Sequence, residues 1–301
     1  MDCVLKTNRL TKQFAGRKAV NNVDLCVQKG DIYGFIGKNG AGKTTLIRMA
    51  VGLAAPTSGS IELFGSRDLT AQRAKIGTVI EYPAVFPHMT ARENLMTQCK
   101  LMNVKDLSVI DRTLQIVGLE NTGKKKARNF SLGMKQRLAI AIALIGDPEF
   151  LFLDEPTNGL DPTGIKEIRQ LIQKLNHEHG ITVLISSHIL GELSKLATRY
   201  GIIDNGVLID EFTAEELEAR CRSSLNIKVN DVQAACAVLQ EVFGTQNYEI
   251  EQHGVISLFD HLDEAGAINT ALAKHDIIVE SIASQTADLE DYFIQVTGGT
   301  R

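Results

Sequence analysis

Residues 37–44 read Gly-Lys-Asn-Gly-Ala-Gly-Lys-Thr and lie between an apolar run at 32–36 and a predicted helix from Thr44 to about Val51. The glycines allow backbone N–H groups to point at phosphate oxygens, and the helix adds its positive end. Lys43 can neutralise the β- and γ-phosphates, and the Thr44 hydroxyl can bind Mg²⁺. A plain glycine-rich turn would not explain the complete match in a strand–loop–helix context. The predicted nucleotide-binding residues are Gly37, Lys38, Asn39, Gly40, Ala41, Gly42, Lys43, Thr44 and Thr45.

Two adjacent acids, Asp154 and Glu155, follow the apolar run at 150–153, which predicts a short buried strand. Ligands of open α/β sheets collect at the carboxyl ends of the strands. At that position Asp154 can hold Mg²⁺, commonly through water, and Glu155 can polarise the water that attacks a γ-phosphate. A solvated turn would also explain two acids, but downstream of a phosphate-binding loop the pair predicts nucleotide hydrolysis.

A further phosphate-directed feature is the sequence Phe-Ser-Leu-Gly-Met-Lys-Gln-Arg-Leu at residues 130–138. Ser131 stands at a predicted helix start, where its hydroxyl, the free backbone N–H groups and the positive end of the helix can all address a phosphate. A plain N-capped surface helix explains the same residues. The segment becomes specific only because Asp154, Glu155 and Asp161 follow it.

The order of these motifs resembles that of the ATP-binding subunit of ATP-binding-cassette (ABC) transporters, over about residues 4–215. Ser131, Gly133 and Met134 stand at the position of the Leu-Ser-Gly-Gly-Gln signature of that family, with Phe130 in place of its leucine. The resemblance implies ATP and Mg²⁺ as cofactors. It also implies that the signature residues contact ATP held by another subunit.

Three more residues take roles through this resemblance. Phe14 aligns with the aromatic residue that stacks on adenine, although a place in the core of a strand would also explain it. His188, just past a strand predicted at 181–185, matches the histidine that contacts the γ-phosphate. Asp161 matches a turn that communicates between two ATP sites. Because Pro162 follows it, Asp161 is also a predicted helix N-cap, and both roles can hold together.

Glu81 departs from the family pattern, which usually has glutamine at this position. The family residue senses Mg²⁺ and the attacking water and passes that state to the membrane subunit. A carboxylate still offers the metal an oxygen, so Glu81 is a candidate metal ligand and catalytic residue. It also adds negative charge beside an anionic phosphate. An acid in a loop unrelated to ATP is the alternative.

Glu81 and residues 130–138 together resemble the bacitracin-resistance and lantibiotic-immunity exporters, and residues 289–293 resemble the tail of the wider exporter group. The resemblance implies export of a peptide antibiotic, a drug or a lipid-like compound for self-protection. It also implies an integral membrane permease and a second ATPase subunit, either identical or homologous. The chain would then be cytoplasmic and peripheral on the inner face of the membrane, held there by the permease.

Strands that alternate with helices predict an α/β fold with a mainly parallel sheet, which the resemblance makes a P-loop NTPase of ABC type. We expect an ATP-binding domain over residues 1–220, with a helical subdomain at about 90–145 that carries the signature. Residues 221–301 read as an accessory C-terminal α+β domain. A regulatory or dimer-stabilising role and a passive extension are both open for it.

Length and composition exclude several classes of protein. The 301 residues leave room for one large and one smaller domain, and 44% hydrophobic with 23% charged residues is typical of a globular protein. A net charge of −4 gives no reason to expect a nucleic-acid partner. Apolar runs such as 138–145 are too short to span a bilayer, and no signal-peptide pattern is present. Widely spaced cysteines argue against a zinc site or a disulfide framework and fit a reducing cytosol; they are Cys3, Cys26, Cys99, Cys221 and Cys236.

Two other functional classes remain open on the sequence. A soluble ABC-type ATPase could act on ribosomes or DNA. Ribosomal members resemble two cassettes in tandem on one chain, and DNA-repair members carry long coiled-coil insertions. This chain has one cassette and no heptad tract of that kind. A protein that senses ATP without hydrolysing it would not need Glu155 and His188.

Overall fold

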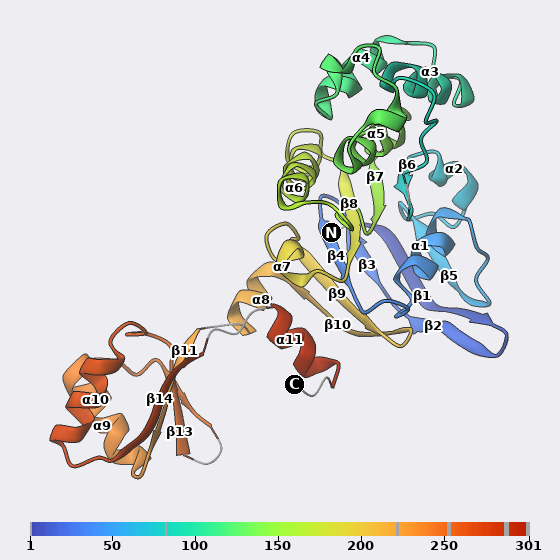
Figure 1. Cartoon of the computed structure of the whole chain (residues 1–301). Coiled ribbons are helices and arrows are strands. Elements are labelled where there is room, and N and C mark those ends of the chain that lie inside the picture. The colour runs from blue at the N-terminus through green and yellow to red at the C-terminus, as the bar shows by residue number, and fades with distance from the viewer. Residues whose placement is uncertain (1, 82, 221–222, 252–253, 286–288, 299–301) are drawn as a thin grey trace. The chain divides into compact units, whose positions relative to one another are not determined.

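The computed structural model describes residues 2–81, 83–220, 223–251, 254–285 and 289–298. The chain divides into two compact units, Met1–Ala214 and Glu215–Arg301 (Figure 1). Cys221 lies outside the described residues. In the part of the chain that is described, no helix combines the length and the apolar character needed to cross a bilayer.

The N-terminal unit is built around a sheet with the strand order β10-β9-β4-β8-β7-β6. Neighbouring strands are parallel, except that β10 pairs antiparallel with β9. Every residue of β4 and β7 is buried, as expected for parallel strands covered on both faces. The strands are β4 (Ile32–Ile36), β6 (Ile76–Val79), β7 (Phe150–Asp154), β8 (Thr182–Ser187), β9 (Arg199–Asp204) and β10 (Val207–Thr213).

A second, antiparallel sheet is centred on the long strand β1, which pairs with the other three strands. These strands are β1 (Cys3–Phe14), β2 (Arg17–Val23), β3 (Cys26–Gln28) and β5 (Ser58–Leu63). Helix α1 (Lys43–Val51) contributes Leu46 and Ile47 to a core that also contains side chains of both sheets, among them Leu5 and Phe152. Because α1 packs against both sheets, the loop before it is held firmly.

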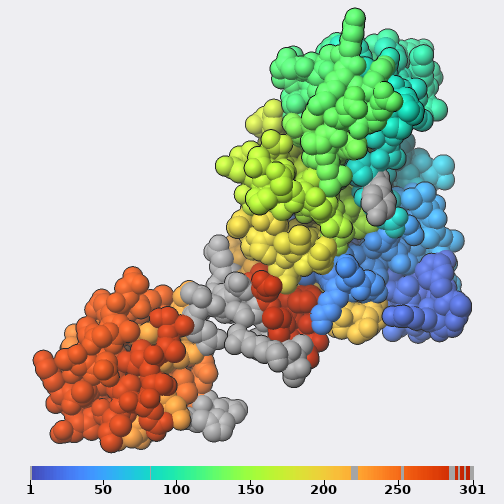
Figure 2. Space-filling model, viewed as in Figure 1, coloured from blue at the N-terminus to red at the C-terminus, as the bar shows by residue number. Residues whose placement is uncertain are grey.

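The remaining helices of this unit include the helical region and the helix after Asp161 that the sequence predicts, and two short helices that it does not. A helical region lies where the sequence predicts a helical subdomain and forms one end of the unit, drawn in teal to green in Figure 2. Its first helix opens with a capping box, in which the backbone N–H of Thr90 holds the pKa of Glu93 at about 2. The region comprises α3 (Ala91–Leu101), α4 (Ser108–Ile116), η1 (Glu120–Thr122), η2 (Ala127–Asn129) and α5 (Leu132–Leu144). The other helices are α2 (Leu69–Arg73), α6 (Pro162–His177) and α7 (Leu190–Leu193).

The C-terminal unit contains a βαββαβ arrangement, with the antiparallel strand order β12-β13-β11-β14. This is the ferredoxin-like topology, and it confirms the predicted α+β class. Helices α9 and α10 pack on the sheet through one apolar core. The elements are α8 (Ala214–Arg220), β11 (Ser224–Val229), α9 (Val232–Phe243), β12 (Tyr248–Ile250), β13 (Val255–Leu258), α10 (Ala265–Lys274), β14 (Val279–Gln285) and α11 (Leu289–Val296).

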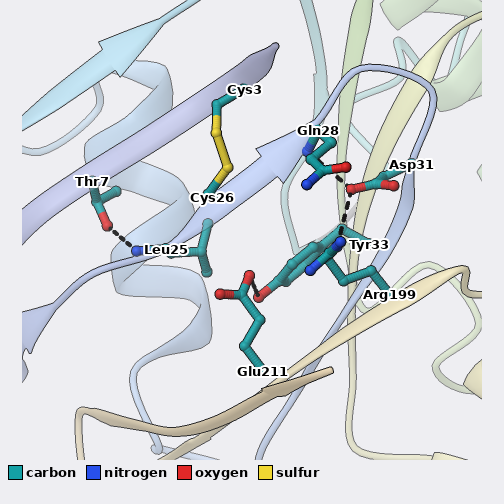
Figure 3. Close-up of a disulfide and its surroundings, with 9 residues drawn as sticks. All are labelled: Cys3, Thr7, Leu25, Cys26, Gln28, Asp31, Tyr33, Arg199 and Glu211. Atoms are coloured by element: carbon teal, nitrogen blue, oxygen red, sulfur yellow. Dashed lines mark hydrogen bonds and ion pairs between the residues drawn. A yellow bond between two sulfur atoms is a disulfide. The ribbon is translucent and has the colours of Figure 1, made fainter. Parts of the chain in front are cut away.

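One prediction about the cysteines is wrong. Cys3 and Cys26 form a disulfide, with their Cα atoms 5.8 Å apart (Figure 3). They are 23 residues apart in sequence, but they lie on β1 and β3, which pair antiparallel. Sequence spacing did not reveal this proximity because the strand pairing creates it. Cys99 and Cys236 are free thiols.

A buried phenol joins two strands of the central sheet near this disulfide (Figure 3). The Tyr33 hydroxyl donates to Glu211 Oε1 at 2.9 Å. Burial raises the pKa of Tyr33 well above its ordinary value, and burial also raises the pKa of Glu211. Gly201 lies directly against the Tyr33 hydroxyl, so that a Cβ atom added there would displace the phenol.

We therefore expect Gly201→Ala to lower the free energy of unfolding by about 1–3 kcal/mol, because overpacking would separate Tyr33 from Glu211. Gly191→Ala is the matched control, since Gly191 is a helical glycine with open space around its Cα atom. Urea unfolding of both variants measures the difference. Equal stability of the two variants would contradict this account of the buried phenol.

Candidate active site

The loop predicted to bind phosphate connects β4 to α1. Gly42 has φ 115°, and an added Cβ atom would collide with the carbonyl oxygen of Ala19, so this position requires glycine. The first N–H groups of α1 have no partner within the helix and are available to an anion. They border a hollow lined by Ala19, Lys38, Asn39, Gly40, Gly42, Lys43, Thr44, Thr45 and Glu155. The structure therefore brings most of the predicted loop residues together with one of the predicted acids.

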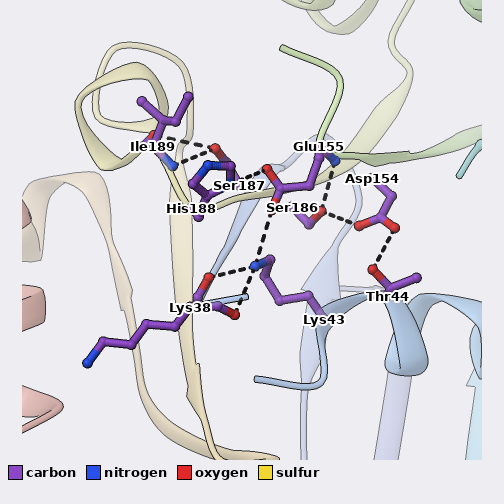
Figure 4. A network of polar contacts seen from close by, with 10 residues as sticks. Lys38, Lys43, Thr44, Asp154, Glu155, Ser186, Ser187, His188 and Ile189 are labelled. Carbon is purple, nitrogen blue, oxygen red and sulfur yellow. Dashed lines mark hydrogen bonds and ion pairs between the residues drawn. The ribbon is translucent and has the colours of Figure 1, made fainter. Parts of the chain in front are cut away.

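Lys43 is the buried cation of this hollow. Its Nζ atom donates to the carbonyl oxygens of Gly37 at 2.5 Å and Lys38 at 3.3 Å (Figure 4). It also lies 3.2 Å from Glu155 Oε1, within ion-pair distance although without hydrogen-bond geometry. The side chain is only 6% exposed. A positive charge thus stands at the centre of the site, between the loop and the acidic strand end.

Asp154 ends β7 and is almost completely buried, at 1% exposure. Thr44 Oγ1 donates to its Oδ2 atom at 2.7 Å. A hydroxyl and a carboxylate are hard oxygen donors of the kind that Mg²⁺ prefers. Among the described residues, no group of three or more His, Cys, Asp or Glu side chains is placed so that it could hold a metal ion. One hydroxyl and one carboxylate leave positions on a metal ion open for phosphate oxygens.

Glu155 and His188 lie side by side at the ends of neighbouring strands. His188 Nδ1 is 2.7 Å from Glu155 Oε2 (Figure 4). The backbone of Glu155 has φ 51°, a left-handed conformation that is uncommon outside glycine. This conformation directs the Glu155 carboxylate at both Lys43 and His188. The structure thus brings together an acid, an imidazole and a lysine, as catalysis at a γ-phosphate would require.

Sequence reasoning did not single out Ser186, which lies within this cluster. Its hydroxyl donates to Asp154 Oδ1 at 2.5 Å and accepts from the Glu155 backbone N–H at 3.0 Å. The signal was present in the run Ser186-Ser187-His188, at the end of a predicted strand. Only the register of β8 against β7, which places Ser186 opposite Asp154, distinguishes Ser186 from Ser187.

The signature residues lie at the exposed start of α5. Ser131 is the N-cap, and its Oγ atom accepts from the backbone N–H of Met134 at 3.2 Å. A Cβ atom on Gly133 would lie 3.9 Å from Gly164 of α6. Asp161 caps α6 in the same way, because its Oδ1 atom accepts from the N–H of Gly164 at 3.1 Å. Ser131 and Asp161 therefore start adjacent helices, with their own side chains exposed to solvent.

Phe14 ends β1 with 52% of its surface exposed, so it is not the core residue of the alternative interpretation. Lys12 Nζ lies 4.9 Å from the centre of its ring. Phe14 pairs in register with Arg17, which lines a second hollow together with Ala19 and Gly40. The exposed ring is available for stacking on a flat ligand.

Glu81 makes a contact that the sequence did not predict. Its Oε1 atom lies 2.6 Å from Arg48 Nη2, and both side chains are about half exposed, at 51% and 45%. Arg48 lies on α1, one helical turn after Thr44. The backbone of Glu81 is left-handed, with φ 61°. The structure thus pairs Glu81 with a cation of α1.

Comparison with known proteins agrees with this geometry. The protein-family model described as "ABC transporter" matches residues 20–158. The chain is 44% identical over 302 residues to the bacitracin transport ATP-binding protein BcrA of Bacillus licheniformis, with 99% of each chain covered. The chain belongs to the ABC transporter family. Membership in this family confirms that it is an ATP-binding subunit with ATPase activity.

Other members of the family extend the comparison. The lantibiotic transport ATP-binding protein SrtF of Streptococcus pyogenes is 43% identical over 208 residues, which cover 69% of this chain and 90% of that protein. The dimeric post-hydrolysis structure of the ATP-binding cassette MJ0796 with ADP and Pi is 27% identical, with a TM-score of 0.63, and covers 70% of this chain and 98% of that chain. The predicted resemblance to bacitracin and lantibiotic exporters is confirmed.

Proposed function

We propose that this ABC ATPase powers a membrane permease that exports a peptide antibiotic or a similar amphiphilic compound. The observation that carries the proposal is the 44% identity to a bacitracin transport subunit, which extends over both units of the chain. The similarity to ATP-binding subunits of bacitracin and lantibiotic transporters favours a transport ATPase over a ribosomal or DNA-repair ATPase. The contacts among Lys43, Glu155 and His188 favour it over a sensor that does not hydrolyse ATP.

In this proposal the loop residues and Lys43 bind the β- and γ-phosphates of ATP. Thr44 and Asp154 hold Mg²⁺, which when bound reduces the negative charge of the phosphates. Glu155 Oε2 or Oε1 accepts a proton from a water molecule whose oxygen forms a bond to the γ-phosphorus, while the bond from phosphorus to the leaving oxygen of ADP breaks. His188 orients the Glu155 carboxylate and contacts the γ-phosphate.

The signature residues are proposed to act on a second subunit. Ser131 and the N–H groups around Gly133 and Met134 are at an exposed helix start, where they can contact ATP on another chain. Asp161 lies beside them and would sense the state of that neighbouring site. The dimeric arrangement of the MJ0796 cassette supports an assembly in which two chains share two ATP molecules.

A permease partner follows from the transport relatives, and it would hold the chain at the cytoplasmic face of the membrane. The ferredoxin-like unit is part of the region aligned with BcrA, which supports a role of that unit in the same transporter class. Regulation or stabilisation of the dimer is the role that we propose for it.

A Glu155→Gln variant tests the proposed function. Loss of the carboxylate should lower kcat by about 100-fold or more, because proton transfer to a positioned base is removed, while ATP binding is retained. Cells that carry this variant with the permease should become as sensitive to bacitracin as cells without the subunit. Glu149→Gln is the control, because Glu149 is an exposed acid that pairs with Lys75 at 3.4 Å. Normal ATPase activity and resistance in the Glu155→Gln variant would contradict the proposal.

A second test addresses the shared site. Slow hydrolysis in Glu155→Gln should leave ATP bound and give a particle of twice the subunit mass, measured by light scattering. Adding Ser131→Glu should abolish that dimer, because a carboxylate would face the phosphates of the partner's ATP. Ser108→Glu, at the exposed start of α4, is the matched control and should leave the dimer intact. If the double variant Glu155→Gln/Ser131→Glu still forms the ATP-bound dimer, the signature helix does not face the ATP of the partner subunit.

Glu81→Gln should retain ATP binding but alter hydrolysis, its Mg²⁺ dependence or its coupling to export. The loss of the exposed pair with Arg48 should change the free energy of unfolding by less than about 1 kcal/mol. ATPase rates over a Mg²⁺ titration measure the effect on hydrolysis, and urea unfolding measures the effect on stability. Glu62→Gln, remote on β5, removes a comparable pair with Arg67 and serves as control. Unchanged rate, Mg²⁺ dependence and transport would remove Glu81 from the mechanism.

A further inference from the structure

Ser186 is a buried serine between the two acids of the site. It lies near the carboxyl end of β8 and has no exposed surface. Its hydroxyl contacts Asp154 Oδ1 at 2.5 Å and the backbone N–H of Glu155 at 3.0 Å (Figure 4). One side chain thus touches the predicted metal ligand and the backbone of the predicted base.

The chemistry of these neighbours fixes the direction of both hydrogen bonds. An ionised carboxylate only accepts, and a backbone N–H group only donates. The single hydroxyl proton of Ser186 therefore points to Asp154, and an oxygen lone pair points to the N–H of Glu155. The hydroxyl cannot rotate without losing a bond in a buried region, where lost hydrogen bonds are costly.

Each oxygen of the Asp154 carboxylate accepts one hydroxyl hydrogen bond, Oδ1 from Ser186 at 2.5 Å and Oδ2 from Thr44 at 2.7 Å. Thr44 is another predicted Mg²⁺ ligand, so Oδ2 is the oxygen next to that ligand, and the bond from Ser186 to Oδ1 fixes the carboxylate in this orientation. Changing a group that orients a metal ligand in this way typically lowers metal affinity or activity by about 10- to 100-fold.

The bond to Glu155 stabilises an uncommon backbone conformation. With φ 51°, Glu155 is in the left-handed region, which is unfavourable for a residue with a Cβ atom. Its N–H group meets the hydroxyl of Ser186 at 3.0 Å and the Ser186 carbonyl oxygen at 3.2 Å. This backbone position is what directs the carboxylate to Lys43 and His188.

We propose that Ser186 is a positioning residue for the ATPase reaction, which sets the metal-facing oxygen of Asp154 and the direction of the Glu155 carboxylate through one hydroxyl. The inference rests on the roles proposed for Asp154 and Glu155. It differs from a general packing role because it requires the hydroxyl and acts specifically on the Mg²⁺-dependent part of nucleotide binding.

The same strand offers a matched control. Thr182, at the other end of β8, is 1% exposed, and its hydroxyl accepts from the backbone N–H of Gly30 at 2.9 Å. Thr182→Val removes a buried hydroxyl from the same strand without touching the acids. Ser186→Thr keeps a hydroxyl at the site, and β-branched residues are favoured in strands.

The test compares ADP affinity in EDTA with ADP affinity in Mg²⁺, and then ATPase rate over a Mg²⁺ titration. In Ser186→Ala, ADP affinity in EDTA should stay unchanged, because the phosphate-binding loop is intact. The gain in affinity on adding Mg²⁺ should fall about 10-fold or more, and the Mg²⁺ concentration for half-maximal ATPase activity should rise to a similar extent. Ser186→Thr should restore both quantities, and Thr182→Val should leave both unchanged.

The proposal is overturned if Ser186→Ala binds Mg²⁺–ADP like the unaltered protein, or if Ser186→Ala and Thr182→Val lose affinity equally in EDTA and in Mg²⁺. Asp154→Asn separates this inference from the proposed function. If Asp154→Asn leaves Mg²⁺ dependence unchanged, the assignment of the metal site is wrong. If Asp154→Asn changes it and Ser186→Ala does not, only the role of Ser186 is wrong.

Discussion

A carboxylate that has lost contact with water needs a hydrogen-bond or charge partner for each oxygen. Leaving such a buried charge unpaired costs roughly several kcal/mol of folding free energy. Asp154, at 1% exposure, meets this requirement with two hydroxyl groups, from Thr44 and from Ser186. These residues belong to α1 and β8, so both elements must meet the end of β7 at a single point. The strand order places β8 beside β7, and the tight glycine loop places the start of α1 at the end of β7.

The same constraint explains why the site is ordered. Lys43 is held by loop carbonyl groups on one side and faces Glu155 on the other. Glu155 in turn contacts His188, and its backbone is held by Ser186. Each charged group therefore has a partner of opposite charge or a hydrogen bond, and the phosphate-binding loop is connected to the acidic strand end through direct contacts.

Local sequence patterns predicted much of the fold and of the candidate site. The run at 32–36, the helix start at Ser131 and the proline after Asp161 depend on neighbouring residues, and each element formed where expected. The loop at 37–44 was predictable because phosphate binding needs glycine, lysine and threonine at fixed spacing. The backbone geometry of such features is determined by a short stretch of sequence, so they can be predicted without knowledge of the fold.

Features that depend on strand pairing or on distant side chains could not be predicted in this way. The contact between Ser186 and Asp154 exists because β8 and β7 are neighbours, and the bond between Cys3 and Cys26 exists because β1 pairs with β3. The sequence marked Glu81 as unusual, but it gave no means of locating Arg48, which is 33 residues away. Long-range neighbours require the three-dimensional fold.

The exposure of Phe14 has a consequence for the choice of nucleotide. If a base stacks on this ring, it meets a flat surface that every purine and pyrimidine can cover, because stacking needs only a π-face. Discrimination between adenine and guanine needs hydrogen bonds to the edge of the base, which a phenyl ring cannot provide. Stacking on Phe14 would therefore add affinity for any base without selecting among bases, and selection between adenine and guanine would have to come from groups other than this ring.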